Sequence, residues 1–396
     1  MLHFESVSAA LADLVVVDLT TVRSGPTCTK ILADFGAEVI HVERPGESDR
    51  GRVFFDQADL HRNKKSIVVN LQDPRGLEIV KRLAARADVV VENYRPDVKR
   101  RLGVDYETLS RDNPRLVYGS ISGFGQEGPY RDRPGYDQIV QGMSGLMWLT
   151  GTAETAPLRI GIPIGDLLAG YFCAMGIITA LLERGRSGRG QHVTTSLLEA
   201  MVGSLSFQAA NYLNTGNVPP PVGNHHPQTA PMGVYRAKDG FMNIAVGNDD
   251  MFQRFCRVLG VPELGGDPRF APGQERVKNR RALDAVIVER LATRTVAEWI
   301  EAFNAAGVAC GPIYTVDQVF ADEQVRRAGL VHEQVHETFG PVKVVGLPVT
   351  LSRTPATVRT PAPVPGAHTR EVLGRLGYTA QEIDAFAAAG AIEVTK

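Results

Sequence analysis

The segment Gly161–Gly176, GIPIGDLLAGYFCAMG, places one aspartate, Asp166, among residues that are otherwise apolar or glycine. A carboxylate there keeps little water, and a poorly hydrated, ionised carboxylate can act as a nucleophile in covalent catalysis. Gly161 and Gly165 would let a large substrate approach the backbone closely. The alternative is structural: Asp166 could cap the helix that follows, where the helix dipole would stabilise its charge.

A second candidate is His332–His336, HEQVH, which matches the HExxH zinc signature with His332, Glu333 and His336. That chemistry requires a helix, which places both histidines on one face. The surrounding valines alternate as in a strand, where residues four apart are separated by about 13 Å. We therefore expect no metal site, and a zinc hydrolase remains only an alternative.

Basic residues recur close to the ends of the predicted strands, and guanidinium groups suit phosphate oxygens. Solvation at the surface is the alternative explanation for each of them. The first β-α turn has a single glycine, in VRSGP, instead of GxGxxG, so a Rossmann dinucleotide site is not supported there, and P-loop and GxSxG motifs are absent from the sequence. The basic residues concerned are Arg23, Arg44, Arg62, Lys64, Lys65, Arg95, Arg100 and Arg101.

The elements that must position these residues alternate between strand and helix. Valine-rich apolar runs predict strands at 14–20, 39–42, 66–71, 88–92 and 116–121. Helices are expected after Ser24, over 74–85, over 167–183 and over 197–211. This order is typical of an α/β fold with a doubly wound, mostly parallel sheet, in which the loops after the strands bind ligands.

A segment rich in proline and glycine indicates a boundary between domains. Residues 214–232 are dense in proline, glycine and asparagine, which predicts a linker and active-site loop. Residues 233–325 are expected to form a smaller α+β domain. Residues 1–213 together with 326–396 would then form the large Rossmann-like domain.

Composition places the chain among ordinary globular proteins. The formal net charge of -1 gives no general attraction to nucleic acid or to an anionic membrane. The four cysteines form no CxxC pair, and the N-terminus shows no secretory signal pattern. The longest apolar segment, Asp166–Leu182, is short for a membrane span. We expect a cytoplasmic protein without nucleic-acid or membrane partners.

Seven segments in order resemble the class III CoA-transferases, which include formyl-CoA transferase, carnitine CoA-transferase and succinate–hydroxymethylglutarate CoA-transferase. The resemblance covers nearly the whole chain and implies an interlocked homodimer. The segments are DLTTVRSGPTCTKILADFGAEVIHVERPG, RNKKSIVVNL, VVVENYRPDVKRRLG, GFGQEGPYRDRPGYD, GLMWLTG, GIPIGDLLAG and GRGQHV.

In that family, the aspartate that matches Asp166 attacks an acyl-CoA thioester. A mixed anhydride and CoA thiolate result, an aspartyl-CoA thioester can follow, and an acceptor carboxylate then takes the CoA. The resemblance thus implies a CoA-transferase with CoA thioesters as substrates and no permanently bound cofactor.

The family's CoA contacts match basic, polar and aromatic residues here. Arg23 stands where formyl-CoA transferase has glutamine, and Pro134 stands where it has lysine. The implied CoA-binding residues are Arg23, Ser24, Arg44, Lys64, Asn93, Tyr94, Arg101 and Tyr136.

The family's mobile loop matches Gly223, Asn224, His225 and His226, where formyl-CoA transferase has a run of glycines. This departure disfavours oxalate, and the region that follows resembles the branch that uses dicarboxylic acids. We expect such an acceptor, with succinyl-CoA as a possible donor. The sequence leaves the donor, the acceptor and the roles of both histidines open.

Two further alternatives remain. The racemases of this fold use a histidine in GHD where this chain has Tyr136, and tyrosine is a poor base near neutral pH. A CoA-binding protein without activity is the other.

Overall fold

The computed structural model describes residues 10–46 and 54–395. The N-terminal residues on which the signal-peptide expectation mainly rests therefore lie outside the described residues. The chain divides into two compact units. The first takes its residues from Met1–Leu146, Arg159–Asn217 and Ala328–Lys396, and the second consists of Met147–Leu158 and Val218–Arg327.

These units differ from the expected domains mainly in two segments, apart from shifts of a few residues at 214–217 and 326–327. Residues 147–158, expected in the large domain, belong to the second unit, and so does 218–232, expected as a linker. The two segments are tied together, since the Gly223 N–H donates to the Gly151 carbonyl at 2.8 Å. Pairing between residues this far apart in the sequence is invisible to a reading of local composition.

The first unit contains a seven-stranded sheet in the order β12-β3-β2-β1-β4-β5-β6. Every pairing in it is parallel except that of β12 with β3. The α/β fold with a large parallel sheet is thus confirmed. Its strands are β1 Val15–Asp18, β2 Glu38–Glu43, β3 Lys64–Val69, β4 Val89–Glu92, β5 Val117–Ser122, β6 His192–Ser196 and β12 Ile392–Glu393.

Both faces of the central strands are buried, which explains why their sequences are continuous apolar runs. Val16 and Val89 pack in one core cluster, and the next residues, Val17 and Val90, pack in the other. This alternation follows from the two-residue period of a strand.

Helices cover the sheet, and residues typical of helix termini mark where they begin and end. Helix α3 begins at Pro74, with the Asp73 carboxylate accepting the Arg75 N–H, and α8 ends before Gly188, which is left-handed. The helices of this part are α1 Ser24–Asp34, α2 Phe54–His61, α3 Pro74–Ala84, α4 Pro96–Leu102, α5 Tyr106–Asp112, α6 Asp137–Met143, α8 Ile164–Ser187, α9 Leu197–Gly203, α10 Ser206–Thr215, α17 Thr369–Arg375 and α18 Ala380–Ala388. Helix α7, Leu146–Thr150, belongs to the second unit except for its first residue.

One expected helix is divided. The range 197–211 was predicted as a single helix, but the structure has α9 and α10, separated by two residues. Ser206 has φ 52, in the left-handed region, which interrupts the helical path.

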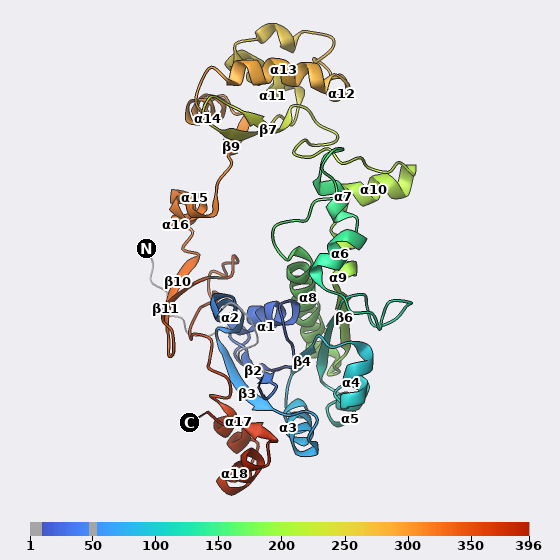
Figure 1. Cartoon of the computed structure of the whole chain (residues 1–396), viewed down its shortest axis with the longest axis vertical. Coiled ribbons are helices and arrows are strands. Elements are labelled where there is room, and N and C mark those ends of the chain that lie inside the picture. The colour runs from blue at the N-terminus through green and yellow to red at the C-terminus, as the bar shows by residue number, and fades with distance from the viewer. Residues whose placement is uncertain (1–9, 47–53, 396) are drawn as a thin grey trace. The chain divides into compact units, whose positions relative to one another are not determined.

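The end of the chain returns to the large sheet. Figure 1 shows the red helix α17 beside the blue strand β3, and β12 pairs with β3. Before it, β10 Val331–His336 and β11 Gly340–Val345 form an antiparallel hairpin. The strand predicted at the HExxH segment is therefore confirmed.

The second unit is α+β. Its antiparallel sheet has the order β7-β8-β9, with Trp299 and Phe303 among the core residues beside it. Its elements are β7 Met232–Arg236, β8 Phe241–Ala245, β9 Ala309–Pro312, α11 Asp249–Leu259, α12 Gly273–Lys278, α13 Arg280–Leu291, α14 Val296–Ala305, α15 Val316–Ala321, α16 Glu323–Arg327 and the 3₁₀ turn Pro262–Gly265.

Helix α8 is the one helix among the described residues that is long and apolar enough to cross a membrane by length and composition alone. Its 24 residues include a window of mean hydropathy 1.7. One face packs on α1, α9 and β5, and the other exposes large apolar side chains. Length and composition are weak grounds for a span when a helix packs on a core in this way.

Candidate active site

A cavity of about 310 Å³ opens beside Asp166, where the turns after β1, β4 and β5 meet the first turn of α8. The sheet order changes direction between β1 and β4. Such a switch point is where open α/β sheets bind ligands. The cavity brings together five residues singled out from the sequence, with Thr21 beside them: Ser24, Asn93, Arg95, Tyr136 and Asp166.

Asp166 is the third residue of α8, and its side chain is half-buried. The N-cap is Pro163, and no side-chain hydrogen bond caps this end of the helix. The N-cap interpretation of Asp166 is therefore wrong, because the helical backbone begins two residues earlier. Its place in the first turn still lets the helix dipole favour the carboxylate.

The surroundings of Asp166 raise its pKa to about 6. Burial is the largest cause, the negative charge of Asp137 adds to it, and the Arg23 guanidinium opposes it. The carboxylate is thus mostly ionised at neutral pH but is more basic than an exposed aspartate. Higher basicity goes with higher nucleophilicity, which suits covalent catalysis.

Gly165 serves packing rather than substrate approach. A Cβ added there would lie 1.9 Å from Met201 Cε of α9. The expectation that Gly165 exposes backbone to a substrate is therefore wrong, because Met201 covers it. Gly161 is exposed and has open space around it.

Two buried polar residues of α6 hold the segment that leads into α8. Asp137 accepts the Gly165 N–H at 2.8 Å with Oδ1 and the Gln141 amide at 2.7 Å with Oδ2. Gln141 in turn accepts the Ile160 N–H and donates to the Ile162 carbonyl. The position of Asp166 is therefore fixed from outside its own helix.

The turn after β1 is held by the turn after β4. The Asn93 side chain accepts the Thr21 N–H at 2.9 Å and donates to the Thr21 carbonyl at 2.7 Å. Val22 follows with φ 66, a strained conformation for a β-branched residue. Strain of this kind persists only where the surroundings enforce it, and it is common at binding sites.

Lys64 lines neither the cavity beside Asp166 nor the larger cavity described below. Its side chain is fully buried, with the ammonium 3.0 Å from Asp18 Oδ2 and 2.8 Å from Thr29 Oγ1. Asp18 also accepts the Thr20 N–H. The expectation that Lys64 contacts CoA phosphates does not fit this placement, because its charge is already satisfied inside the core.

A similar buried pair supports the turn after β4. Glu92 accepts the Lys99 ammonium at 2.8 Å and the Tyr94 N–H, also at 2.8 Å. Each of the two strands at the switch point thus ends in a buried carboxylate that pairs with a lysine and holds the turn two residues on.

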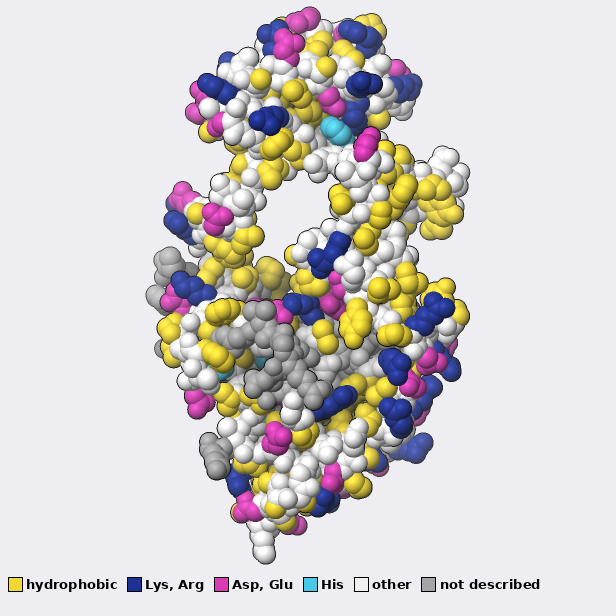
Figure 2. Space-filling view, viewed as in Figure 1, with side chains coloured by type: hydrophobic (Ala, Val, Ile, Leu, Met, Phe, Trp, Pro, Cys, Tyr) yellow, Lys and Arg dark blue, Asp and Glu magenta, His cyan; other side chains and the backbone are white. Residues whose placement is uncertain are grey.

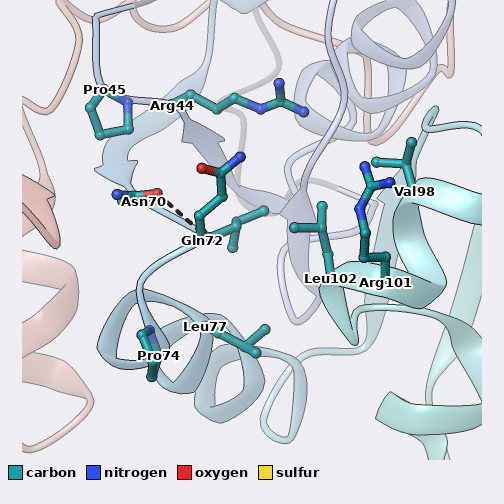
Figure 3. A pocket seen from close by; sticks show the side chains of 10 residues that line it. Arg44, Pro45, Asn70, Gln72, Pro74, Leu77, Val98, Arg101 and Leu102 are labelled. Atoms are coloured by element: carbon teal, nitrogen blue, oxygen red, sulfur yellow. Dashed lines mark hydrogen bonds between the residues drawn. The ribbon is translucent and has the colours of Figure 1, made fainter.

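A larger cavity of about 780 Å³ lies at the turn after β3 and beside α4. Arg44 and Arg101, both expected to bind CoA, line it with Asn70 and Gln72. Figure 3 shows Gln72 extending toward Arg44, with Arg101 rising from α4 on the other side. Lys and Arg side chains also gather over α4 and α5 in Figure 2. This basic cavity could hold phosphate groups.

Arg23 and Tyr94 occupy intermediate positions. Arg23 is partly exposed and pairs with Asp56 at 2.6 Å, close enough to Asp166 to lower its pKa. Tyr94 is buried, and the Arg44 guanidinium lies 5.4 Å from its ring centroid. Tyr94 thus supports a cavity residue rather than lining the larger cavity itself.

The expected acceptor loop, Gly223, Asn224, His225 and His226, belongs to the second unit. His225 Nε2 lies 3.8 Å from Asp284 Oδ2, and the His226 N–H donates to a backbone carbonyl. Gly223 has φ 59, which favours glycine.

The HExxH histidines lie in strand β10, four residues apart along an extended backbone. That geometry separates them by about 13 Å, too far to share one metal ion. Among the described residues, no group of three or more His, Cys, Asp or Glu side chains could hold a metal. The zinc hydrolase alternative is therefore not supported by the structure.

Sequence reasoning missed Asp137 and Gln141. Their spacing of one helical turn, directly after Tyr136, is a signal that could have been read. What the sequence could not supply was their partner, since Asp137 and Gly165 are 28 positions apart.

Known proteins resemble this chain over most of its length. The pattern of CoA-transferase family III matches residues 11–369. Succinyl-CoA:glutarate CoA-transferase of Mus musculus is 39% identical over 388 residues, covering 96% of this chain and 89% of the relative. Acetyl-CoA:oxalate CoA-transferase of Acetobacter aceti is 39% identical over 348 residues, covering 86% and 88%.

A solved structure is similar in fold as well. The crystal structure of a CAIB/BAIF family protein from Brucella suis superposes with a TM-score of 0.83 at 36% identity. The match covers 93% of this chain and 100% of the other. The family resemblance read from the sequence is confirmed by these matches.

Proposed function

This chain belongs to CoA-transferase family III and is a CoA-transferase, and we propose that it moves CoA from succinyl-CoA to a dicarboxylic acid of the glutarate type through Asp166. The observation that carries the proposal is the half-buried Asp166 carboxylate in a cavity, with its pKa raised to about 6. The named activity of the mouse relative supports the donor and the acceptor class.

The proposed reaction is an exchange at carboxylate and thioester carbons. An Asp166 oxygen attacks the thioester carbonyl, the C–S bond breaks, and CoA leaves as the thiolate with the bonding electrons. The thiolate then attacks the Asp166 carbonyl of the mixed anhydride, which releases the donor acid and leaves an aspartyl-CoA thioester. An oxygen of the acceptor carboxylate then attacks the aspartyl-CoA thioester, which releases CoA thiolate and leaves a second mixed anhydride. The thiolate attacks the acceptor's carbonyl carbon in this anhydride, which forms the new acyl-CoA and frees the Asp166 carboxylate. One thioester replaces another, so the exchange needs neither ATP nor a metal.

Asp166 is tested by trapping. The protein is incubated with succinyl-CoA, quenched with hydroxylamine or borohydride, and mapped by mass spectrometry. We expect the modification on the peptide that contains Asp166, and its loss in Asp166→Asn together with transfer. Unchanged turnover by Asp166→Asn, or modification only elsewhere, would contradict the proposed nucleophile.

CoA binding is proposed to use both cavities, with Ser24, Asn93 and Tyr136 near the thioester and Arg44 and Arg101 near the phosphates. Arg23 would add positive charge at the reacting end. The buried Asp18–Lys64 pair would only support the site. Two substitutions separate these roles.

Arg101→Met should raise KM for the acyl-CoA about tenfold or more, since a charge-assisted hydrogen bond contributes roughly 1.5–3 kcal/mol. Its melting temperature should stay close to that of the parent. Lys64→Met should instead destabilise the fold by about 3–5 kcal/mol, because it removes the ammonium that pairs with the buried Asp18 carboxylate. Steady-state kinetics and thermal unfolding measure both. Equal effects of the two changes on KM alone would show that the roles are wrongly divided.

His225 and His226 are proposed to influence acceptor choice from the second unit. An acceptor series of glutarate, succinate and oxalate with the double variant to alanine tests this. An unchanged order of preference would remove both residues from the proposal. The Acetobacter relative, named for oxalate, makes oxalate the necessary comparison.

A racemase is the alternative with the same fold. It would exchange the α-proton of a 2-methylacyl-CoA with deuterium from the solvent. We expect no exchange above the rate without protein, since Tyr136 stands where those enzymes use histidine.

We also propose a homodimer of interlocked chains in a reducing, cytoplasmic compartment. The four cysteines are all free thiols, three of them buried. Tyr171, Met175, Ile178 and Leu182 expose large apolar surface along α8. A second copy of the chain would cover this stripe.

A further inference from the structure

The amino end of α8 is held by a carboxylate that the reaction scheme above does not use. Asp137 is nearly inaccessible, with 7% of its surface exposed, and Gln141 beside it is fully buried. Both Asp137 oxygens accept hydrogen bonds, one from the Gly165 N–H and one from the Gln141 amide. A buried carboxylate that costs solvation but lies outside the reacting atoms calls for an explanation.

Its position connects two walls of the cavity. Asp137 is the first residue of α6, directly after Tyr136, which lines the cavity and is 66% exposed. Its hydrogen-bond partner Gly165 directly precedes Asp166. The Asp137 side chain therefore links the backbone next to the tyrosine with the backbone next to the nucleophile.

The negative charge of Asp137 also acts on the Asp166 carboxyl. Asp137 and Arg23 are the charged groups that shift the titration of Asp166, in opposite directions. Arg95 and Tyr136 share its cavity, and the elements packed on this end of α8 add Ser24 from α1, Ser122 from β5 and Leu197 from α9, all neutral. The Arg159 guanidinium lies 3.8 Å from Asp137, is 41% exposed, and neutralises it only in part.

We propose that Asp137 is a positioning residue for the transfer reaction, which orients Asp166 through the Gly165 N–H and keeps a second negative charge beside the nucleophile. The inference rests on Asp166 being the nucleophile. Before attack the two carboxylates repel each other. When an Asp166 oxygen bonds to the acyl carbon, the C–S bond breaks and the negative charge leaves on the CoA sulfur. Acylation thus relieves the repulsion, and Asp137 makes the free carboxylate more reactive.

The test variant is Asp137→Asn, which removes the charge but keeps an oxygen that can accept the Gly165 N–H. We expect kcat for transfer from succinyl-CoA to fall at least tenfold, while KM for succinyl-CoA changes less than threefold. The acidic limb of the pH profile of kcat/KM should move from about pH 6 to lower pH by about one unit, because Asp166 loses a like-charged neighbour.

Two controls separate charge from structure. Gln141→Met keeps the Asp137 charge but loses the hydrogen bonds from Gln141 to Asp137 and to the segment before α8. The acidic limb of the pH profile should therefore stay where it is, while kcat falls. Asp132→Asn removes an exposed carboxylate five positions earlier, which pairs with Arg131, and should leave kcat and the limb unchanged. Melting temperatures report whether each variant is folded.

Asp137→Ser serves as a second variant if Asp137→Asn does not fold. A folded variant of either kind with an unmoved acidic limb and an unchanged kcat would overturn the proposal, as would a change confined to KM. Trapping on Asp166 in the unmodified protein tests the nucleophile separately. If trapping succeeds but the acidic limb of the Asp137 variant does not move, the role of Asp137 is rejected and Asp166 remains the nucleophile. If trapping fails, the proposed function itself is rejected.

Discussion

At the scale of the residue, Asp166 combines two features that oppose each other. Its place in the first turn of a helix favours the charge, while burial and Asp137 disfavour it, and the second influence is stronger, since the pKa is raised to about 6. A nucleophile that is ionised and yet reactive is obtained at the expense of stability, as expected where a site is built for reaction rather than for folding.

Asp166→Asn should therefore stabilise the fold. In the unfolded chain the pKa of this carboxyl returns to about 3.8. Above pH 6 the folded state then carries an unfavourable charge, which costs at most about 3 kcal/mol. The difference shrinks as the pH falls from 6 towards 4, because the folded state is protonated first, and it disappears well below pH 3.8.

Urea unfolding at pH 7.5 and at pH 4 measures the effect. We expect a higher free energy of unfolding for Asp166→Asn at pH 7.5 and little difference at pH 4. A variant less stable than the parent at pH 7.5 would contradict the assigned environment of Asp166.

At the scale of the element, the amino end of α8 is positioned by contacts from the neighbouring helices α9 and α6. Met201 of α9 covers Gly165, and Asp137 of α6 binds its N–H. These two contacts hold the first turn of α8 beside the cavity. A small displacement of this turn would move Asp166, and reaction rates are sensitive to shifts of about 1 Å.

Gly165→Ala tests this placement. The new methyl group would overlap Met201, so we expect a loss of about 1–3 kcal/mol of stability and a lower kcat. The matched control is Gly185→Ala in the same helix, where nothing lies within 4 Å, and this should stabilise the protein by roughly 0.5–1 kcal/mol.

Adding Met201→Ala to Gly165→Ala should restore part of the kcat, because it makes room for the methyl group. Thermal unfolding and steady-state kinetics follow both properties. A Gly165→Ala protein as active and as stable as the parent would show that Met201 moves freely and does not position α8.

At the scale of the whole molecule, two features bear on assembly. Helix α8 carries a stripe of exposed apolar side chains, and the first unit combines residues from both ends of the sequence. A second copy would bury that stripe. If the two chains are interlocked, they cannot separate without unfolding.

We expect a mass roughly twice the 42.9 kDa of one chain by light scattering, at micromolar and at nanomolar concentration. Chains carrying two different tags should exchange only under unfolding conditions. Leu182→Glu should impair assembly, whereas Arg186→Glu at an exposed polar position of the same helix should not. A monomer, or exchange within minutes in native buffer, would contradict the interlocked dimer.

Local patterns in the sequence were sufficient for the elements of the large sheet and for the candidate nucleophile. Runs such as Val15–Asp18 and Val89–Glu92 identify buried strands because backbone period and side-chain burial are properties of neighbouring residues. The same holds for Asp166, whose apolar flanks are visible in the sequence. The strand at the HExxH motif was read correctly for this reason.

Tertiary structure alone decided which polar residues face the ligand and which support it. Lys64 and Arg101 look alike in sequence, yet one is buried against Asp18, 46 positions away, and the other lines a cavity. Asp137 joins Gly165 across 28 positions, and Met201 of α9 packs directly against Gly165. The physical reason is common to all three: solvation, charge pairing and steric contact depend on neighbours in space, and the sheet brings those neighbours together only when the chain has folded.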